Sequence, residues 1–111
     1  MANIIWRTID VRGKPIELAE QAWEHILEKR PFLAGFQDIA RLTVEDPDVC
    51  TLETDGSINY YRRGVMGRFP ALYLHVLARD DPRAAAQVLT AWPTAAVDDY
   101  EEILWLRGMR S

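Results

Sequence analysis

The sequence predicts an α+β domain over residues 1–111, with N-terminal helices packed on one face of a small antiparallel β-sheet. Three observations predict this class. Apolar residues recur at helical spacing in two early segments, 16–30 and 33–44. The later segments are short, alternating or continuously apolar, and Gly and Pro separate them. The chain has 111 residues, which is the length of one domain and enough to bury a core without disulfides.

The first half of the chain predicts one strand followed by two helices. Residues 4–11 alternate loosely, as a strand does. Pro15 can open the helix that follows, because the N–H that proline lacks has no partner in the first helical turn. This helix is expected to end at Arg30, and Pro31 can open the second one. The apolar stripe of the first helix consists of Ala19, Ala22, Trp23, Ile26 and Leu27.

The second half predicts a sheet built from short strands. Asp55-Gly56 is a strong hairpin signal, because this pair readily takes the positive φ of a tight primed turn. Ala71 to Ala78 is apolar on both faces and predicts a central strand. Pro93 is expected to end the last strand. In order, the expected strands are 49–53, 57–63, 71–78 and 86–92, and a short helix is expected over 98–106.

Composition and charge exclude several classes of protein. No apolar run approaches the roughly 18 residues of a membrane span, and the first residues lack the features of a signal peptide. The single cysteine, Cys50, cannot form an internal disulfide, which fits a reducing cytoplasm. The formal net charge of −4 argues against a general nucleic-acid binder. Residues 57–92 alone sum to +3, which predicts a local phosphate-binding patch or simply surface arginine on a sheet.

Several common chemistries lack their motifs here. The sequence contains no glycine-rich phosphate loop, HExxH, CxxC or GxSxG. Its two histidines and one cysteine are far apart, so neither a metal nor another cofactor is expected. Asp46 and Asp48 lie at a helix-to-strand corner and are interpreted as turn and capping residues. His75 lies in the most apolar strand and is interpreted as a buried or half-buried residue with one hydrogen-bond partner.

His25 is the main candidate for acid–base chemistry. It lies beside the apolar stripe of the first helix, with Lys29 one turn later on the same side. A histidine at such a boundary can reach a cleft between helix and sheet and exchange protons near neutral pH. The alternative is a boundary histidine that hydrogen-bonds a backbone carbonyl.

Four further candidates lie on the expected strands, each with a structural alternative. Thr90 is either an ordinary strand former or a hydroxyl that holds a phosphate oxygen. Arg62 can grip phosphate with its guanidinium fork, or it can remain solvated at a sheet edge. Tyr60 and Trp92 can stack a nucleobase, or they can fill the core.

Six short motifs occur in a fixed order: Trp23-Glu-His25-Ile26, Arg30-Pro31, Asp46-Pro47-Asp48-Val49, Asn59-Tyr60-Tyr61-Arg62, the apolar strand Leu72 to Leu77, and Leu89-Thr90-Ala91-Trp92. This order resembles the phage-associated barnase–EndoU–colicin–RelE-like (BECR) nuclease group. That group reads W-x-H-I, H-P, D-P-D-x-I, a tyrosine-rich strand, V-V-V and a closing T-A-Y. The resemblance covers residues 20–93, about two thirds of the chain. It implies a barnase-like sheet with helices against it and a metal-independent RNase activity.

The resemblance also implies roles for individual residues. His25 matches the helix histidine, Thr90 matches the last-strand threonine, and Arg30 stands where the group has a histidine before proline. These three are the expected catalytic residues, although an arginine can bind phosphate but cannot transfer protons near neutral pH. Tyr60, Tyr61 or Lys29 can supply the second proton-transfer group. The expected substrate-binding residues are Arg62, Tyr60, Trp92 and Lys29.

The function expected from the residues and the resemblance together is that of a metal-independent endoribonuclease in the cytoplasm. It would cleave RNA to 2′,3′-cyclic phosphate ends, as a toxin or as a phage or mobile-element protein. An antitoxin or another protein can be its partner, and no membrane contact is expected. One alternative is a catalytically inactive domain of the same fold that binds another protein. Another is a structural subunit that dimerises through an edge strand.

Overall fold

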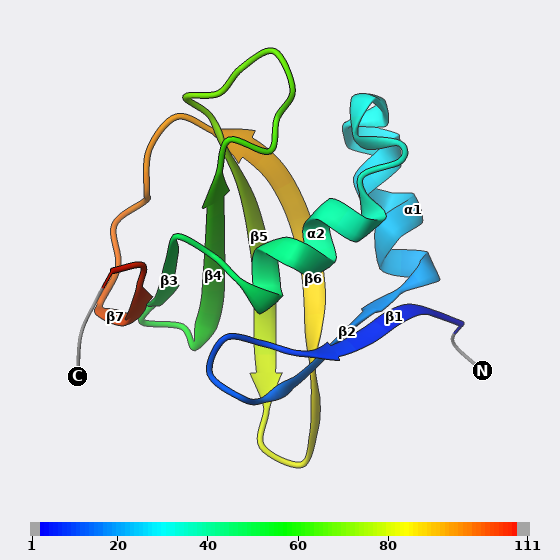
Figure 1. Ribbon diagram of the computed structural model, residues 1–111. Helices are drawn as coiled ribbons and strands as arrows, with labels where there is room; N and C mark the ends of the chain where they lie inside the picture. Colours follow the sequence, from blue (N-terminus) through cyan, green and yellow to red (C-terminus); the bar gives the residue numbers. More distant parts are fainter. Residues whose placement is uncertain (1–2, 109–111) are drawn as a thin grey trace.

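One seven-stranded β-sheet forms the body of the protein, and the computed structural model describes it over residues 3–108 (Figure 1). Residues 1 and 2, part of the segment inspected for a signal peptide, lie outside the described residues. The elements in chain order are β1 (Ile4–Ile9), β2 (Pro15–Ala19), α1 (Glu20–Lys29), the 3-10 helix η1 (Pro31–Leu33), α2 (Gln37–Glu45), β3 (Val49–Leu52), β4 (Ser57–Arg63), β5 (Tyr73–Asp81), β6 (Ala84–Thr94) and β7 (Glu102–Leu106).

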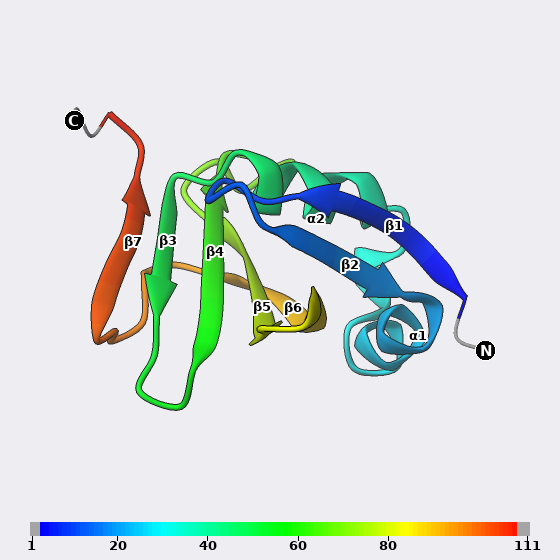
Figure 2. The same ribbon diagram turned by 90° about the horizontal axis from the view of Figure 1, so that it is seen from below.

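The sheet is mixed. Its strand order is β1-β2-β6-β5-β4-β3-β7, and neighbouring strands are antiparallel except for β2 and β6, which are parallel. α2 contacts β1, β4 and β5, whereas α1 contacts β2 and β6. Figure 2 shows β1 and β2 side by side at one side of the molecule, with β3, β4 and β7 at the other side.

The predicted class, α+β with N-terminal helices on a small antiparallel sheet, is wrong. Residues 3–108 are mostly β, with 44% strand and 21% helix, and contain only two short α-helices. One cause is the segment Pro15–Ala19, which was expected to open the first helix and instead forms β2. Ile16 and Leu18 alternate with half-buried or exposed residues and are 0% exposed, which is the period of a strand. β2 lies between β1 and β6, so both of its edges are hydrogen-bonded.

The second cause is the terminal segment, which was expected to be a helix over 98–106. Glu102–Leu106 is instead β7, an antiparallel partner of β3. Ile103 and Trp105 are strong strand formers, and β7 supplies the ladder partners that the outer edge of β3 would otherwise lack. Tyr100, Ile103 and Leu104 have helical spacing, but pairing with the edge of β3 determines the conformation of this segment.

The hairpin expected at Asp55-Gly56 is confirmed, because this turn joins β3 to β4. Gly56 has a φ of +87°, which glycine adopts without strain, but Asp55 has no positive φ, so the turn is not of the expected primed type. The strand expected over 57–63 is β4. Pro93 was expected to end the last strand, but it lies inside β6 and pairs with Leu74. β2 borders β6 only at Ala86 and Gln87, so the missing N–H of Pro93 removes no bond to β2.

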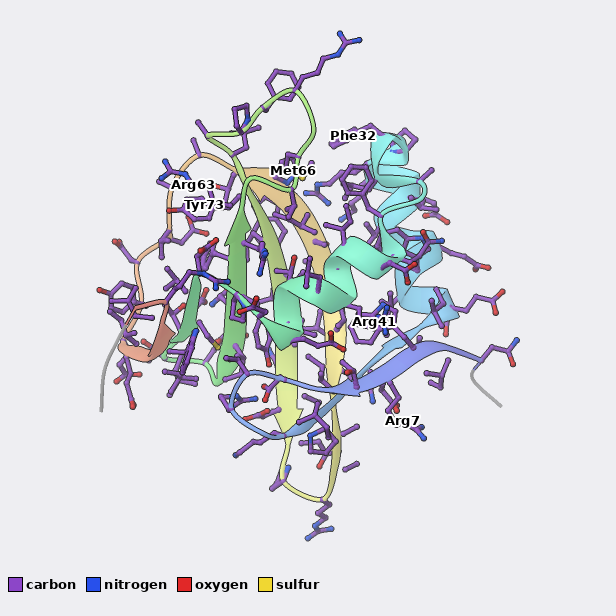
Figure 3. All side chains as sticks on the ribbon, in the orientation of Figure 1. Arg7, Phe32, Arg41, Arg63, Met66 and Tyr73 are labelled. Atoms are coloured by element: carbon purple, nitrogen blue, oxygen red, sulfur yellow. The ribbon has the colours of Figure 1, made fainter. Side chains whose placement is uncertain are left out.

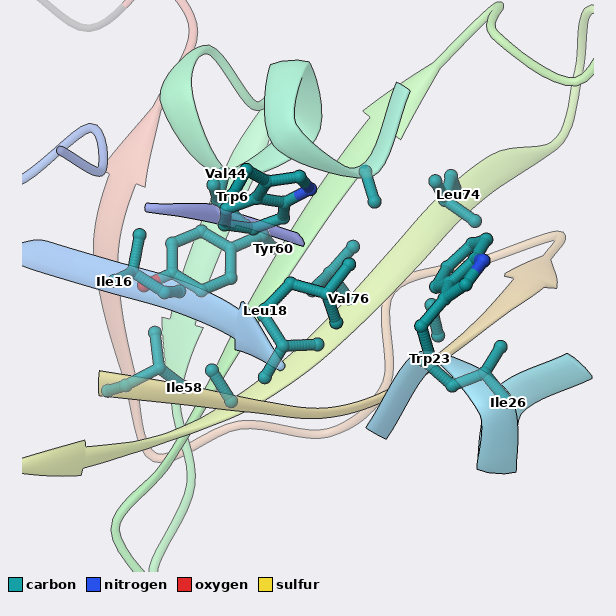
Figure 4. Packing of buried hydrophobic residues seen from close by; sticks show 14 of the residues in the cluster. Trp6, Ile16, Leu18, Trp23, Ile26, Val44, Ile58, Tyr60, Leu74 and Val76 are labelled. Carbon is teal, nitrogen blue, oxygen red and sulfur yellow. The ribbon is translucent and has the colours of Figure 1, made fainter. Parts of the chain in front are cut away.

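The core lies between the helices and one face of the sheet, here called the helix face (Figure 4). Tyr60 and Val76 are cross-strand partners on this face and are both 0% exposed. Trp23 and Ile26 of α1 and Val44 of α2 pack into the same cluster. Side chains at the alternate positions lie on the opposite face, here called the second face. Its members include Asn59, Tyr61 and Arg63 of β4, Tyr73, His75 and Leu77 of β5, and Thr90, Trp92 and Thr94 of β6.

Candidate functional site

A row of stacked rings crosses three strands on the second face. Tyr61, His75 and Trp92 are direct cross-strand partners in β4, β5 and β6. The ring centroids of Tyr61 and His75 are 4.1 Å apart with an interplanar angle of 31°, and those of His75 and Trp92 are 4.1 Å apart at 47°. These are contact distances for tilted stacking, so each ring holds its neighbours in place.

Arg30 ends this row. Its guanidinium carbon lies 5.7 Å from the centre of the Trp92 ring, within the range of a cation–π contact. Arg30 is the residue at which α1 stops: its N–H bonds the carbonyl of Ile26 at 2.8 Å, and Pro31 then begins η1. The proline fixes where the helix ends and therefore where the arginine leaves it. Four residues from four separate elements thus form one stack.

A chain of hydrogen bonds holds the central imidazole. Asn59 donates through Nδ2 to Glu53 at 2.8 Å, which turns its Oδ1 toward His75. Nε2 of His75 lies 2.5 Å from that oxygen and therefore carries the ring proton. Its Nδ1 has no hydrogen-bond partner within the described chain, and the nearest carboxylate oxygen, from Asp98, is 3.8 Å away. Burial lowers the pKa of His75 to about 3, so the ring is neutral at physiological pH.

The connection between β6 and β7 covers the Tyr61 end of the row. The backbone N–H of Asp98 donates to the hydroxyl oxygen of Tyr61 at 3.2 Å, and the N–H of Glu101 donates to the carbonyl of Leu52 at 2.9 Å. Tyr61 is 0% exposed, and burial raises its pKa to about 12. The phenol is therefore a poor proton donor or acceptor near neutral pH. The open part of the row is the Trp92 end.

A second arginine–aromatic contact lies beside the first, at the same end of the strands. Arg63, the last residue of β4, places its guanidinium carbon 5.4 Å from the centre of the Tyr73 ring. Tyr73 meets Tyr61 edge-on, with ring centroids 6.0 Å apart at 80°. Figure 3 shows Arg63 and Tyr73 at the end of the molecule that also carries Met66 and Phe32. Two guanidinium groups therefore flank one aromatic cluster.

The structure brings three of the expected site residues together. Arg30 and Trp92 are in contact, and Thr90 lies two residues before Trp92 on the same face. Thr90 is half-buried. Their positions are set by the end of α1 and the alternation of β6.

His25 and Lys29 lie on the solvent side of α1. The side chain of His25 is 59% exposed, and its Nδ1 is 3.9 Å from a carboxylate oxygen of Glu28. His25 precedes Arg30 by five residues, which places the two side chains about 140° apart around the helix. The structure thus places His25 away from the stack, exposed and beside a carboxylate. The expected reach into a cleft between helix and sheet is absent among the described residues.

Tyr60 and Arg62 project from the helix face, on the other side of the sheet from Trp92. The Tyr60 hydroxyl donates to Asp10 at 2.6 Å, and burial raises its pKa far above the usual range. A ring that is 0% exposed cannot stack on a base. Arg62 is held by Asp46, with a nitrogen–oxygen distance of 2.7 Å. Both residues are therefore occupied by contacts within the chain.

Sequence reasoning named Tyr61 only as a possible proton-transfer group and gave Asn59 no role, so neither was expected in this cluster. The neighbours that these two residues meet depend on the register between β4 and β5. The interpretation of His75 as a buried residue with one hydrogen-bond partner is confirmed. The interpretation of Asp46 and Asp48 as corner residues agrees with their ion pairs to Arg62 and Arg107.

Comparison with protein-family models, curated proteins and solved structures finds no match to this chain. Within residues 3–108, no three His, Cys, Asp or Glu side chains are grouped so that they could hold a metal ion. Over the same residues, no helix has the length and apolar character needed to cross a membrane.

Proposed function

We propose that this chain is a metal-independent endoribonuclease that binds single-stranded RNA at the Arg30 end of the ring row. One observation carries the proposal: the guanidinium of Arg30 lies over the half-buried Trp92 ring, which stacks on His75, and His75 in turn stacks on Tyr61. Guanidinium groups bind phosphate, and aromatic rings stack on bases. A rigid row of rings would hold both groups in fixed positions, which a phosphodiester site requires.

The distribution of unpaired cations supports phosphate binding at this end. Among residues 3–108, six arginines form ion pairs with carboxylates: Arg7, Arg12, Arg41, Arg62, Arg79 and Arg107. Six further cations form none in that part of the chain. Four of them, Lys29, Arg30, Arg63 and Arg68, lie where α1 and β4 end or in the loop that follows β4, and the other two, Lys14 and Arg83, lie in the β1–β2 and β5–β6 turns. Positive charge without an internal partner is available to a phosphate backbone.

The proposed chemistry is attack of the ribose 2′-hydroxyl on the adjacent phosphorus. The new P–O bond forms the 2′,3′-cyclic phosphate, the bond to the 5′-oxygen breaks, and that oxygen takes a proton as it leaves. Arg30 would stabilise the charge that builds on the phosphorane oxygens. Thr90 would hold a non-bridging oxygen through its hydroxyl. Water would accept the proton of the 2′-hydroxyl and supply one to the leaving 5′-oxygen, because His75 is sealed and neutral and His25 lies on the far side of α1 from the stack.

The test is cleavage of mixed single-stranded RNA by the purified protein in EDTA, with analysis of the 3′ ends. We expect cyclic phosphate ends from the wild type and from His25→Ala, because His25 lies on the far side of α1 from the stack. Arg30→Ala should lose about 100-fold or more, because it removes charge stabilisation in the transition state. The matched control is Arg83→Ala, an exposed arginine in the β5–β6 turn, which should cleave like wild type. Full activity in Arg30→Ala would overturn the proposed site.

A second candidate function is a catalytically inactive module that binds RNA or a protein without cleaving it. The positions of the two histidines favour it: one is buried with a lowered pKa, and the other lies on the far side of α1 from the stack. The same experiment separates the two functions. RNA that binds and remains uncut with folded wild type supports the binding module. RNA that neither binds nor is cut, together with stable capture of a protein, supports a protein partner.

A further inference from the structure

Two exposed phenylalanines lie at the Arg30 end of the molecule. Phe32 is 59% exposed and Phe69 is 62% exposed, the two highest values among the exposed large hydrophobic residues of the described chain. Phe32 belongs to η1, directly after α1, and Phe69 belongs to the loop between β4 and β5. Both segments are at the upper end in Figure 1, where β4 and β6 finish. Neither ring is buried in the core of the monomer, so core packing does not explain why an aromatic residue stands at these two positions.

The loop that carries Phe69 is built to present it. Met66 is 8% exposed and belongs to the hydrophobic core, so it anchors the loop from inside. The N–H of Phe69 bonds the carbonyl of Met66 at 3.2 Å, and the N–H of Leu72 bonds the carbonyl of Phe69 at 3.0 Å. Gly67 has a φ of +60°, a conformation that favours glycine. Met66 therefore points into the protein while Phe69 points out.

Phe32 is presented in a similar way. The next residue, Leu33, is 0% exposed and packs in the core, and the N–H of Leu33 bonds the carbonyl of Arg30 at 3.0 Å. The short turn thus fixes the backbone on both sides of the ring. Figure 3 shows Phe32 at the outer end of the α1–η1 region. A fixed aromatic ring loses little conformational entropy when a ligand stacks on it.

Each of these rings has an arginine beside it that forms no ion pair within the described residues. Arg68 directly precedes Phe69, and Arg30 precedes Phe32 by two residues. The exposed Ile9 on β1 differs in this respect, because the arginine on its strand, Arg7, forms an ion pair with Glu17 at 2.7 Å. Aromatic rings interleaved with free cations are typical of single-stranded nucleic-acid surfaces, where bases stack and phosphates are neutralised.

We infer that Phe32 in η1 and Phe69 in the β4–β5 loop are base-stacking platforms for single-stranded RNA at the end of the molecule that carries the Arg30–Trp92 contact. The inference rests on the proposed RNA function and narrows its substrate class. Duplex RNA is excluded as the preferred ligand, because its bases are stacked on one another and offer no free face to a protein ring. Nucleotides on both sides of the bound phosphate would therefore contribute to affinity.

The test measures binding of a short fluorescent RNA by anisotropy. The RNA carries 2′-O-methyl groups, so that it cannot be cleaved and binding is measured alone. Phe32→Ala and Phe69→Ala should each weaken binding by about five-fold or more, and the double variant should weaken it further. Phe32→Leu and Phe69→Leu keep an apolar side chain without a π face and should lose as much as the alanine variants. Annealing the complementary strand should also abolish most of the binding.

The controls separate failure of this inference from failure of the proposed function. Ile9→Ala removes a similarly exposed apolar side chain, 55% exposed, from β1 and should bind RNA like wild type. Unchanged affinity in the double alanine variant, with wild type binding well, overturns the platforms and leaves the RNA function standing. Full affinity in the leucine variants also overturns them, because general apolar contact then suffices. A wild type that binds no single-stranded RNA overturns both.

Discussion

His75 shows how one residue can be important to a site without taking part in its chemistry. The ring lies between Tyr61 and Trp92, and its Nε2–H is committed to Asn59. The His75 ring therefore fills the space between Tyr61 of β4 and Trp92 of β6, and its contact with Trp92 holds that ring in place. A protonated imidazole here would be a buried charge, and burial accordingly lowers its pKa to about 3.

This lowered pKa predicts how stability depends on pH. The unfolded chain takes up a proton on His75 near pH 6.5 and the folded chain only near pH 3, so the unfolded state binds more protons between these values. Stability is therefore complete above about pH 6.5 and declines as the pH falls. The free energy of unfolding should be about 2 kcal/mol lower at pH 5 than at pH 7. Urea unfolding at both pH values measures it.

The control for this prediction is His75→Gln. This variant should be less stable at both pH values, because it loses the stacking, but the difference between them should shrink strongly. The carboxylates with lowered pKa values, such as Asp46 and Asp80, lose their contribution at lower pH, so they interfere little in this interval. An equal pH dependence in wild type and variant would show that the pKa of His75 is not lowered on folding, because the carboxylate of Asp98, 3.8 Å from Nδ1, would then offset the effect of burial.

At the scale of elements, a buried ion-pair network joins the β1–β2 turn to the rest of the sheet. Asp10, whose side chain is 0% exposed, accepts bonds from Arg12, from the Tyr60 hydroxyl and from the backbone N–H of Lys14. Arg12 also forms two bonds to Asp80, both of 3.0 Å. β1, β4 and β5 are thereby fastened together on the helix face. This fastening holds β2 in position beside β6.

Removing the central cation of this network should destabilise the fold strongly. Arg12→Ala leaves a buried carboxylate without its charge partner, which costs about 3 kcal/mol or more in comparable sites. Arg7→Ala is the matched control, because Arg7 forms a single ion pair with Glu17 and is 64% exposed. That change should cost less than about 1 kcal/mol. Denaturant titration of both variants would refute the role of the network if the two losses were equal.

The elements also show what the sequence could predict. Local signals sufficed for the β3–β4 hairpin, because the Asp55-Gly56 turn and the alternation of residues 57–63 agree with each other. They failed for Pro15–Ala19 and Glu102–Leu106, because both segments become strands only by pairing with strands distant in the sequence. The candidate site could be predicted only in part, for the same reason. Arg30 and Trp92 were expected as site residues, but their contact depends on where the end of α1 lies relative to β6. Local sequence patterns do not determine the distance between these two elements.

At the scale of the whole molecule, the charges are distributed unevenly between the two ends. Four of the six cations that form no ion pair within residues 3–108, Lys29, Arg30, Arg63 and Arg68, belong to the end where β4 and β6 finish, whereas Lys14 and Arg83 lie in the β1–β2 and β5–β6 turns. At the opposite end, beside the β3–β4 turn, a hollow of about 430 Å³ is lined by Glu53, Asp55, Asp99 and Glu101 together with Thr54 and Tyr100. A chain of net charge −4 can therefore still present a basic surface to RNA at one end, while its acidic end repels the same polyanion.

This polarity predicts the salt dependence of RNA binding. Each cation that neutralises a phosphate of single-stranded RNA adds about −0.7 to the slope of log K against log salt concentration. Four such contacts give a slope of about −3 for the wild type. Arg68→Ala removes one contact and should reduce the steepness by about 0.7. Arg83→Ala is the matched control. Like Arg68, Arg83 is exposed and forms no ion pair within residues 3–108, but it lies in the β5–β6 turn at the opposite end of the molecule. Anisotropy titrations at several salt concentrations measure all three slopes, and equal slopes for the two variants would show that RNA does not distinguish the two ends.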